Sequence, residues 1–516
     1  MLILFSNFVF FKIMPYLRIV KRLLPVFLIL FWISVGKSFG RAILTAIPTN
    51  LSSWETSQPQ PGTPKREYRA VWLTTIKNLD WPVSPASSLT GEEQQQHALC
   101  EMLDTLQAIG INTVLLQTRL RGDVIYPSLI EPFTKVFSGR DGKAPSYDPL
   151  LFAIRECHQR GMQCHAWIVA LQVKDNKYVD PASQREVDHL CAMVREVVRN
   201  YDVDGIHLDY IRYPEKTRGN DQTRRDNVSQ CMKSVYRTVK EEKPWVCVSA
   251  ATLGKYRDTQ RASSHGWNAY NTVFQEAQEW TREGYVDALF PMLYYRDKHY
   301  FPFVADWAEN AHERAFVAGL GIYQLDRKEQ DWEIEAIRSQ ISYIRSFEGE
   351  HAHAGMVYGN EASGYALFRA GFILKNTKGI KDEIRWFNQH PALVPAVPST
   401  DVPYPAEPTH LTGQLQGSQV TLRWNDAVTL SSGPIRYNIY FSVDEPIDIQ
   451  DSNHLVLTYQ STNAVQLPYP GYGHNAFYAV TAINRYGQES MPAYYTIHAH
   501  TPHQIGKDLV PLAPQH

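Results

Sequence analysis

The strongest constraint on the fold is a regular alternation of short apolar runs and longer helical patterns between Arg66 and Pro391. This alternation is typical of βαβ units, in which crossover helices join parallel strands. The clearest helical patterns occur at residues 92–109, 149–160 and 184–201. Candidate strands occur at residues 70–75, 112–119, 163–169, 205–212, 246–252, 288–295, 315–322 and 355–358. Eight such units in about 325 residues predict a (β/α)8 TIM-type barrel.

An open, doubly wound sheet is the alternative arrangement of such units. It usually carries a glycine-rich phosphate loop directly after its first strand. Here residues 76–82 read IKNLDWP and contain no glycine. The sequence therefore favours the closed barrel, which we place at residues 66–391.

A second domain with a different pattern is expected at residues 404–501, after a Pro-, Val- and Ser-rich linker at 392–403. Its short alternating runs are separated by turn residues, as in a β-sandwich. These residues resemble a fibronectin type III module, through Trp424 in VTLRW, Tyr437 in YNIYFS and the run FYAVTAINRYGQES. The resemblance implies an immunoglobulin-like spacer or docking module, with Tyr478 making its corner hydrogen bond.

The amino-terminal 40 residues have the order of a secretory signal peptide. Arg18, Lys21 and Arg22 precede a mainly apolar run at 23–35, and the small residues Ser38 and Gly40 follow, with Phe39 between them. A full membrane span needs about 20 apolar residues, so we expect export with cleavage, to the periplasm or surface of a bacterium. Membrane contact is expected only through this signal. Residues 41–65 are interpreted as a linker, and residues 502–516 as a disordered tail.

Charge and composition narrow the range of partners. Lys and Arg total 51 and Asp and Glu total 53, so the net charge of −2 gives no basic excess to neutralise nucleic-acid phosphates. Aromatic residues make up 12% of the chain, which is compatible with sugar stacking. The six cysteines form no CxxC pair, so we expect buried free thiols and no zinc site. No cofactor is predicted.

The reacting groups of a barrel of this type lie at the carboxyl ends of its strands. In the fourth candidate strand His207 and Asp209 share one face, and Ile206 and Leu208 share the other. The apolar face suits the surrounding helices, so Asp209 points inward, where a carboxylate is costly unless it is bonded or used. The same alternation predicts an inner rim of Trp72, Arg119, His165, Trp167, His207, Asp209 and Tyr294, with Arg212 at the end of the fourth strand. Apart from the acid Asp209, we expect these residues to bind the substrate.

Four ordered motifs resemble the glycosyl-hydrolase-like family 10. They are REYRAVWLTT at 66–75, QTRLRGDVIYPS at 117–128, GMQCHAW at 161–167 and YDVDGIHLDYIRYP at 201–214. The resemblance implies an exported bacterial barrel that is similar to glycoside hydrolases and is linked in some members to cell-wall glycan. It also implies that Asp209 matches the family's fourth-strand acid. Arg119 and Asp123 match its segment after strand two, and His165 and Trp167 match its HAW.

Glycosidic hydrolysis usually needs two carboxyl groups, and Asp209 supplies one. The candidates for the second are Glu361, expected to follow strand eight in YGNEASG, Asp297 and Asp123. A bridge from Asp123 to Arg119 or Arg121 would keep Asp123 ionised. We therefore expect a glycoside hydrolase acting on a polysaccharide or peptidoglycan. Departures from the family pattern support an alternative, a catalytically inactive glycan-binding protein. A metal-dependent hydrolase using His165, His207 and Asp209 is a third reading.

Overall fold

The computed structural model describes residues 63–174, 177–214, 217–346, 363–398, 402–427, 434–443, 447–471 and 474–498. The predicted signal at 1–40, the predicted tail at 502–516 and most of the first predicted linker lie outside these residues. Within the described part of the chain, no helix has the length and apolar character needed to cross a membrane.

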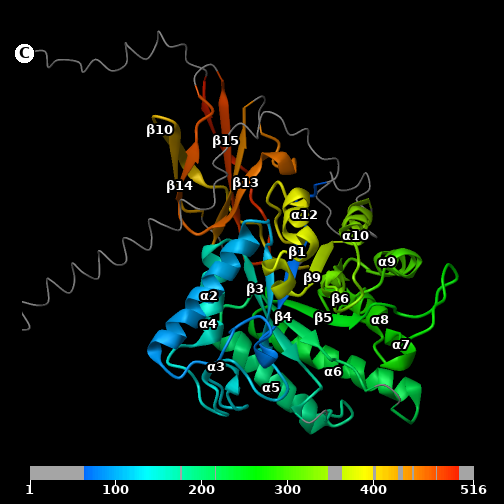
Figure 1. The fold of residues 1–516 in the computed structure, drawn as a ribbon. Helices are drawn as coiled ribbons and strands as arrows, with labels where there is room; N and C mark the ends of the chain where they lie inside the picture. Colours follow the sequence, from blue (N-terminus) through cyan, green and yellow to red (C-terminus); the bar gives the residue numbers. More distant parts are fainter. Residues whose placement is uncertain are drawn as a thin grey trace, which may run out of the picture. The chain divides into compact units, whose positions relative to one another are not determined.

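A closed parallel barrel forms the larger part of the described chain (Figure 1). All of its strands are parallel, and pairing of β9 with β1 and of β5 with β6 closes the ring. β7 and β8 both pair with β6 and are separated only by Val317, so they form one stave of an eight-stave barrel. The strands are β1 (Tyr68–Leu73), β2 (Thr113–Arg119), β3 (Gln163–Val169), β4 (Gly205–Asp209), β5 (Cys247–Leu253), β6 (Ala288–Met292), β7 (Ala315–Phe316), β8 (Ala318–Leu320) and β9 (Gly364–Phe368). The barrel expected from the sequence is confirmed.

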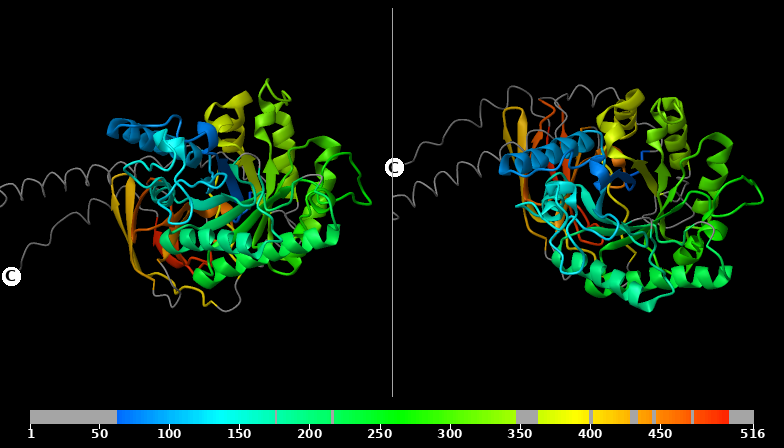
Figure 2. Two further views of the ribbon diagram at one scale, coloured as in Figure 1. Left: turned by 90° about the horizontal axis from the view of Figure 1, so that it is seen from below. Right: turned by 60° about the horizontal axis from the view of Figure 1, so that its bottom comes forward.

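Helices cover the outside of this sheet. The longer ones are α2 (Leu89–Gln107), α4 (Pro149–Gln159), α5 (Gln184–Asn200), α6 (Asp221–Glu242), α9 (Phe301–Glu309), α10 (Ile334–Ser346) and α12 (Ile380–Phe387). Shorter ones are α3 (Lys135–Ser138), α7 (Ala269–Thr272), α8 (Ala277–Arg282) and α11 (Ala370–Leu374). In both views of Figure 2, α5 and α6 lie side by side along the outside of the strands.

The alternation of side chains along each strand produces two separate apolar layers. On β1, Val71 and Leu73 pack into the cluster between sheet and helices, whereas Tyr68 and Trp72 belong to a second cluster inside the barrel. Since successive side chains of a strand point to opposite faces, this period of two fixes which residues enter the barrel. The inward set on β4 is therefore His207 and Asp209.

The eighth stave does not lie where the sequence analysis put it. The predicted strand at 355–358 lies outside the described residues, and the stave that pairs with β1 is β9, from Gly364 to Phe368. Both runs are short and apolar, so local pattern alone does not separate them. The correction matters for Glu361, which precedes β9 in the chain and does not follow it.

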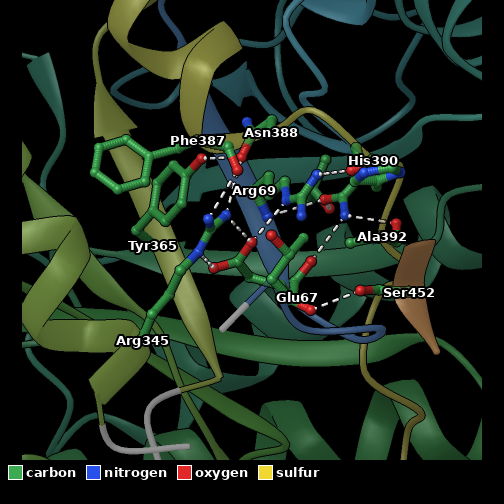
Figure 3. A network of polar contacts seen from close by, with 12 residues as sticks. Glu67, Arg69, Arg345, Tyr365, Phe387, Asn388, His390, Ala392 and Ser452 are labelled. Carbon is green, nitrogen blue, oxygen red and sulfur yellow. Dashed lines mark hydrogen bonds and ion pairs between the residues drawn. The ribbon is translucent and has the colours of Figure 1, made fainter. Parts of the chain in front are cut away.

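The amino-terminal end of the barrel is held by a buried ionic network (Figure 3). The carboxylate of Glu67, just before β1, accepts hydrogen bonds from Arg69 Nε at 2.6 Å and from Arg345 Nε and Nη2 at 2.9 and 2.8 Å. Burial alone would raise the pKa of Glu67, but the guanidiniums of Arg345 and Arg69 lower it below its ordinary value. Tyr365 of β9 joins through Asn388, which accepts from its hydroxyl at 2.9 Å.

The carboxyl-terminal region forms two antiparallel sheets with strand orders β10-β11-β14 and β13-β12-β15-β16. The strands are β10 (Thr409–Gln416), β11 (Gln419–Asn425), β12 (Arg436–Ser442), β13 (Leu455–Gln460), β14 (Ala464–Pro468), β15 (Ala476–Ile483) and β16 (Ala493–Ile497). The corner hydrogen bond expected of Tyr478 is absent among the described residues, where its buried hydroxyl has no partner. In the segment interpreted as a linker, Leu393 and Val394 are buried, and Leu393 forms a β-bridge with Arg66.

Candidate functional site

The carboxyl end of β4 carries the most distinctive acidic group of the barrel mouth. Asp209 is the last residue of β4, and 9% of its surface is exposed. Trp167 Nε1 donates a hydrogen bond to its Oδ2 at 3.2 Å, and the backbone N of Tyr210 donates to Oδ1 at 2.7 Å. Trp167 lies on the neighbouring strand β3, so two residues of the predicted inner rim are in direct contact.

The surroundings of Asp209 make its carboxyl group harder to ionise than that of an ordinary aspartate. Burial raises the pKa of the Asp209 carboxyl above its ordinary value. The positive charge of Arg212 and the bonds from Tyr210 and Trp167 act in the opposite direction but do not overcome burial. A carboxyl group that stays protonated to higher pH is suited to donate a proton. The guanidinium of Arg212 lies over the Tyr210 ring, 4.7 Å from its centroid, close to this acid.

His207 points into the barrel one layer below Asp209, and both of its ring nitrogens are hydrogen-bonded to other side chains of the protein. Trp72 Nε1 donates to His207 Nε2 at 3.1 Å, and His207 Nδ1 lies 2.9 Å from Ser249 Oγ. Since Nε2 accepts, the proton of the neutral ring lies on Nδ1 and is donated to Ser249. Burial, followed by the nearby His165, lowers the pKa of His207 to about 3. His207 was predicted to contact substrate, but its imidazole is fully buried and holds Trp72 instead.

His165 lies deeper still and does not reach the mouth. Its ring is fully buried, and burial lowers its pKa to about 4. Gly205 of β4 leaves the room for it, because a Cβ at that position would lie 2.3 Å from His165 Nδ1. Its Nε2 lies 3.0 Å from Gln163 Oε1. The predicted substrate contact from His165 is therefore corrected to a core position.

Arg119 was also predicted to contact substrate, but its guanidinium is hydrogen-bonded to Glu131 and to the backbone at the end of β3. Its Nε and Nη2 donate to the two carboxylate oxygens of Glu131, each at 2.7 Å. Its Nη1 donates to the backbone oxygens of Val169 and Ala170 at the end of β3. Arg119 thus fixes the strand end that carries Trp167, and Glu131 is a partner that the sequence analysis missed.

The three candidates for a second carboxyl group are placed differently. Among the described residues, no side-chain bridge joins Asp123 to Arg119 or Arg121. Instead Lys174 Nζ lies 3.5 Å from Asp123 Oδ2, and the side chain is 9% exposed. Asp297 has a 78% exposed side chain and shares a surface pocket with Glu333 and Glu335 near the start of α10. Glu361 lies outside the described residues.

Three further rings gather at the mouth, and only one of them was predicted. Tyr294 follows β6, Tyr323 lies in the short helix Ile322–Leu325 after β8, and Phe368 ends β9. The ring centroids of Tyr294 and Phe368 are 5.6 Å apart, and Tyr323 lies edge-on to both. Correct placement of β9 would have predicted Phe368 by alternation. No local signal in the sequence identifies Tyr323.

The donors of the metal-dependent reading do not converge. Both nitrogens of His207 are engaged, and Asp209 is bonded to Trp167 and Tyr210. Across the residues for which coordinates are described, no group of three His, Cys, Asp or Glu side chains has the spacing of a metal site. The arrangement instead presents one protonatable acid among aromatic rings.

One protein family and two curated relatives match this chain. A family described as Glycosyl hydrolase-like 10 matches residues 67–186 and 221–317. Glycosyl hydrolase YngK of Bacillus subtilis (strain 168) is 27% identical over 436 residues, which cover 73% of this chain and 82% of that protein. Glycosyl hydrolase DigH of Escherichia coli (strain K12) is 27% identical over 376 residues, 57% of this chain and 85% of DigH.

Solved structures resemble the chain more distantly. The alpha-L-fucosidase isoenzyme 2 from Paenibacillus thiaminolyticus is 15% identical, with a TM-score of 0.42, and the match covers 63% of this chain and 49% of that one. The weight of the comparison therefore lies on the family match and the two relatives. The family match covers the barrel only in part, and both relatives are named glycosyl hydrolases.

Proposed function

We propose that this protein is a glycoside hydrolase in which Asp209 is the general acid. The observation that carries the proposal is a buried carboxyl group with a raised pKa at the carboxyl end of β4, beside aromatic rings. The substrate is a complex glycan outside the cytoplasm, with bacterial cell-wall glycan as the first candidate. The names of the relatives YngK and DigH support the reaction class.

In the proposed reaction the protonated Asp209 gives its proton to the glycosidic oxygen as the bond to the leaving sugar breaks. The carboxylate that remains is stabilised by the indole N–H of Trp167 and the amide N–H of Tyr210. A second carboxyl group then attacks the sugar or activates water. Asp123, Asp297 and Glu361 stay the candidates for this role.

The remaining parts of the chain fit an exported hydrolase. The amino-terminal pattern at 1–40 is the basis for proposing export and cleavage of a signal. We assign the carboxyl-terminal region to a fibronectin type III-like module. The division into a three-stranded and a four-stranded antiparallel sheet supports this assignment. In this proposal the module acts as a spacer or docking unit, and the reaction takes place in the barrel.

The test is a substrate screen with the mature chain and its Asp209→Asn variant. Both are incubated with peptidoglycan strands and with plant, host and bacterial polysaccharides, and the products are identified by mass spectrometry. The proposal expects reducing-end products from at least one glycan with the wild type and none with the variant. Equal activity in the variant would remove Asp209 from the mechanism. Binding of glycans without any product would favour the alternative, an inactive glycan-binding protein.

The second carboxyl group is assigned by single substitutions on the substrate found in that screen. Asp123→Asn, Asp297→Asn and Glu361→Gln are compared by kcat and by the pH dependence of kcat. The true partner of Asp209 should lose one limb of a bell-shaped profile together with most of kcat. Retention of full activity in all three variants would exclude these candidates. The anomeric form of the first product, followed by NMR, separates retention from inversion.

A further inference from the structure

We infer that Tyr294, Tyr323 and Phe368 form a binding subsite that stacks on a pyranose ring of the substrate. This inference rests on the proposed function and deepens it, because it names the surface that positions the sugar beside Asp209. The subsite is called the three-ring cluster below.

The three-ring cluster is built by three adjacent staves of the barrel. Tyr294 comes from the end of β6, Tyr323 from the segment after β8 and Phe368 from the end of β9. The Tyr294 and Phe368 rings are inclined by only 30°, whereas Tyr323 meets each of them at 85°, with centroids 5.6 and 6.0 Å away. Rings from separate strand ends thus converge on one place at the face where barrel enzymes bind substrate.

Exposure separates this cluster from the rings beneath it. Trp72 is 2% exposed and Phe290 is fully buried, so both belong to the barrel interior. Each ring of the three-ring cluster is only partly buried. Partly exposed aromatic rings are a usual means of binding a ligand with an apolar face. A pyranose has such a face in its axial C–H groups.

The rings are held in place before any ligand binds. Phe368 packs against Trp72 with a centroid distance of 5.9 Å, and Trp72 is fixed by its bond to His207. The Tyr323 hydroxyl accepts a hydrogen bond from Gln324 Nε2 at 3.0 Å. Gly321 lies close against Tyr294, where an added Cβ would come within 3.0 Å of the Tyr294 Cβ. Preformed rings lose little conformational freedom on binding, which favours affinity.

The cluster also lies within the electrostatic reach of the proposed acid. Burial, and after it the charge of Asp209, raises the pKa of Tyr294 well above its ordinary value. The phenol therefore stays a neutral donor, which suits a sugar hydroxyl. A sugar stacked on these rings is placed next to the carboxyl group that would protonate its glycosidic oxygen. The ligand class is a pyranose unit of a longer glycan.

The test measures binding of soluble peptidoglycan strands by calorimetry in the Asp209→Asn background, where no turnover interferes. Adding Tyr323→Ala should weaken binding about ten-fold, because the change removes apolar stacking surface. The matched control, Tyr323→Phe, keeps the ring and should bind as the parent does. Strands that bind equally to the alanine variant and its parent, or to neither, would overturn the subsite.

Kinetics with the unmodified Asp209 separate this inference from the proposed function. Tyr323→Ala should raise KM on long strands more than it lowers kcat. If the wild type releases no product but the Asp209→Asn chain binds strands and loses binding with Tyr323→Ala, hydrolysis is wrong and the subsite stands. If the wild type cleaves strands and Tyr323→Ala changes neither KM nor binding, the subsite is wrong and hydrolysis stands.

Discussion

The two ends of the barrel each contain a buried carboxyl group, and their surroundings differ in one respect. Glu67, before β1, is paired with the guanidiniums of Arg69 and Arg345, and its pKa is lowered. Asp209, at the end of β4, receives two N–H bonds and one opposing charge from Arg212, and its pKa is raised.

The difference between them shows what burial does to an acid in each setting. Full ionic pairing turns the Glu67 carboxylate into a fixed part of the scaffold at the amino-terminal end of the strands. Incomplete pairing leaves the pKa of Asp209 raised at the carboxyl end of the strands, which suits a proton donor. Burial alone therefore does not show which of the two carboxyl groups takes part in the reaction. The number and charge of their partners distinguish them.

The largest expected effect is on catalysis and separates the two acids. Asp209→Asn should lower kcat by about 10²- to 10⁴-fold, the usual contribution of a general acid. Glu67→Gln should leave kcat per folded molecule unchanged, because Glu67 lies at the opposite end of the barrel. Initial rates on the glycan found in the screen, corrected for folded fraction by circular dichroism, give both values. A catalytic loss in both variants would refute the functional distinction drawn here.

The next largest effect is on the free energy of unfolding, where Glu67→Gln should have the large effect that Asp209→Asn has on kcat. Glu67→Gln should lower the free energy of unfolding by about 3–5 kcal/mol, since it removes one partner of a buried ionic network. Urea unfolding measures the loss. The control is Glu283→Gln, whose carboxylate pairs with Arg282 at the surface and should matter little. Similar losses at both positions would show that burial of the Glu67 network contributes nothing.

Much of the barrel follows from the sequence, because each strand is specified by its own alternation. The inward direction of Asp209 and Trp167 could be predicted in this way, but the hydrogen bond between their side chains was not predicted. The position of the last stave could not. It depends on pairing with β1, almost 300 residues earlier in the chain, and two apolar runs compete for that place.

Which inward polar groups stay available to a substrate is also beyond the sequence. His207 points inward as predicted, but Trp72 is already bonded to it. Arg119 follows a register shift in β2 and pairs with Ile168, which packs outside the barrel, and its guanidinium is bonded to Glu131. Trp72 and His207 are 135 positions apart, so no local spacing signals their bond. Alternation predicts the direction of a side chain. Whether that side chain is already bonded to another residue depends on contacts between distant parts of the chain.

A smaller loss of stability is expected when the neutral imidazole of His207, which lies inside the barrel between Glu67 and Asp209, is replaced. His207→Phe should lower the free energy of unfolding by about 1–3 kcal/mol, because it leaves the buried Trp72 N–H without its acceptor. The cost should be below that of Glu67→Gln, which strands charges. Thermal and urea unfolding compare the two variants. A larger loss at His207 would mean that hydrogen bonding in the barrel interior outweighs the ionic network.

The smallest effect concerns the pH dependence of stability, which should have opposite signs at the two acids. A raised folded pKa means that the wild type loses the contribution of Asp209 as pH rises from about 4 through that pKa. Asp209→Asn, which cannot ionise, should therefore be more stable than the wild type at pH 7, and the gain should vanish in acid.

Glu67, with a lowered pKa, contributes to folding stability above its unfolded pKa and loses that contribution as pH falls. The deficit of Glu67→Gln should thus be greatest at neutral pH and shrink in acid. Melting temperatures between pH 3 and 8 test both slopes, and parallel profiles for the two variants would contradict the assignment of one acid to the scaffold and the other to the reaction.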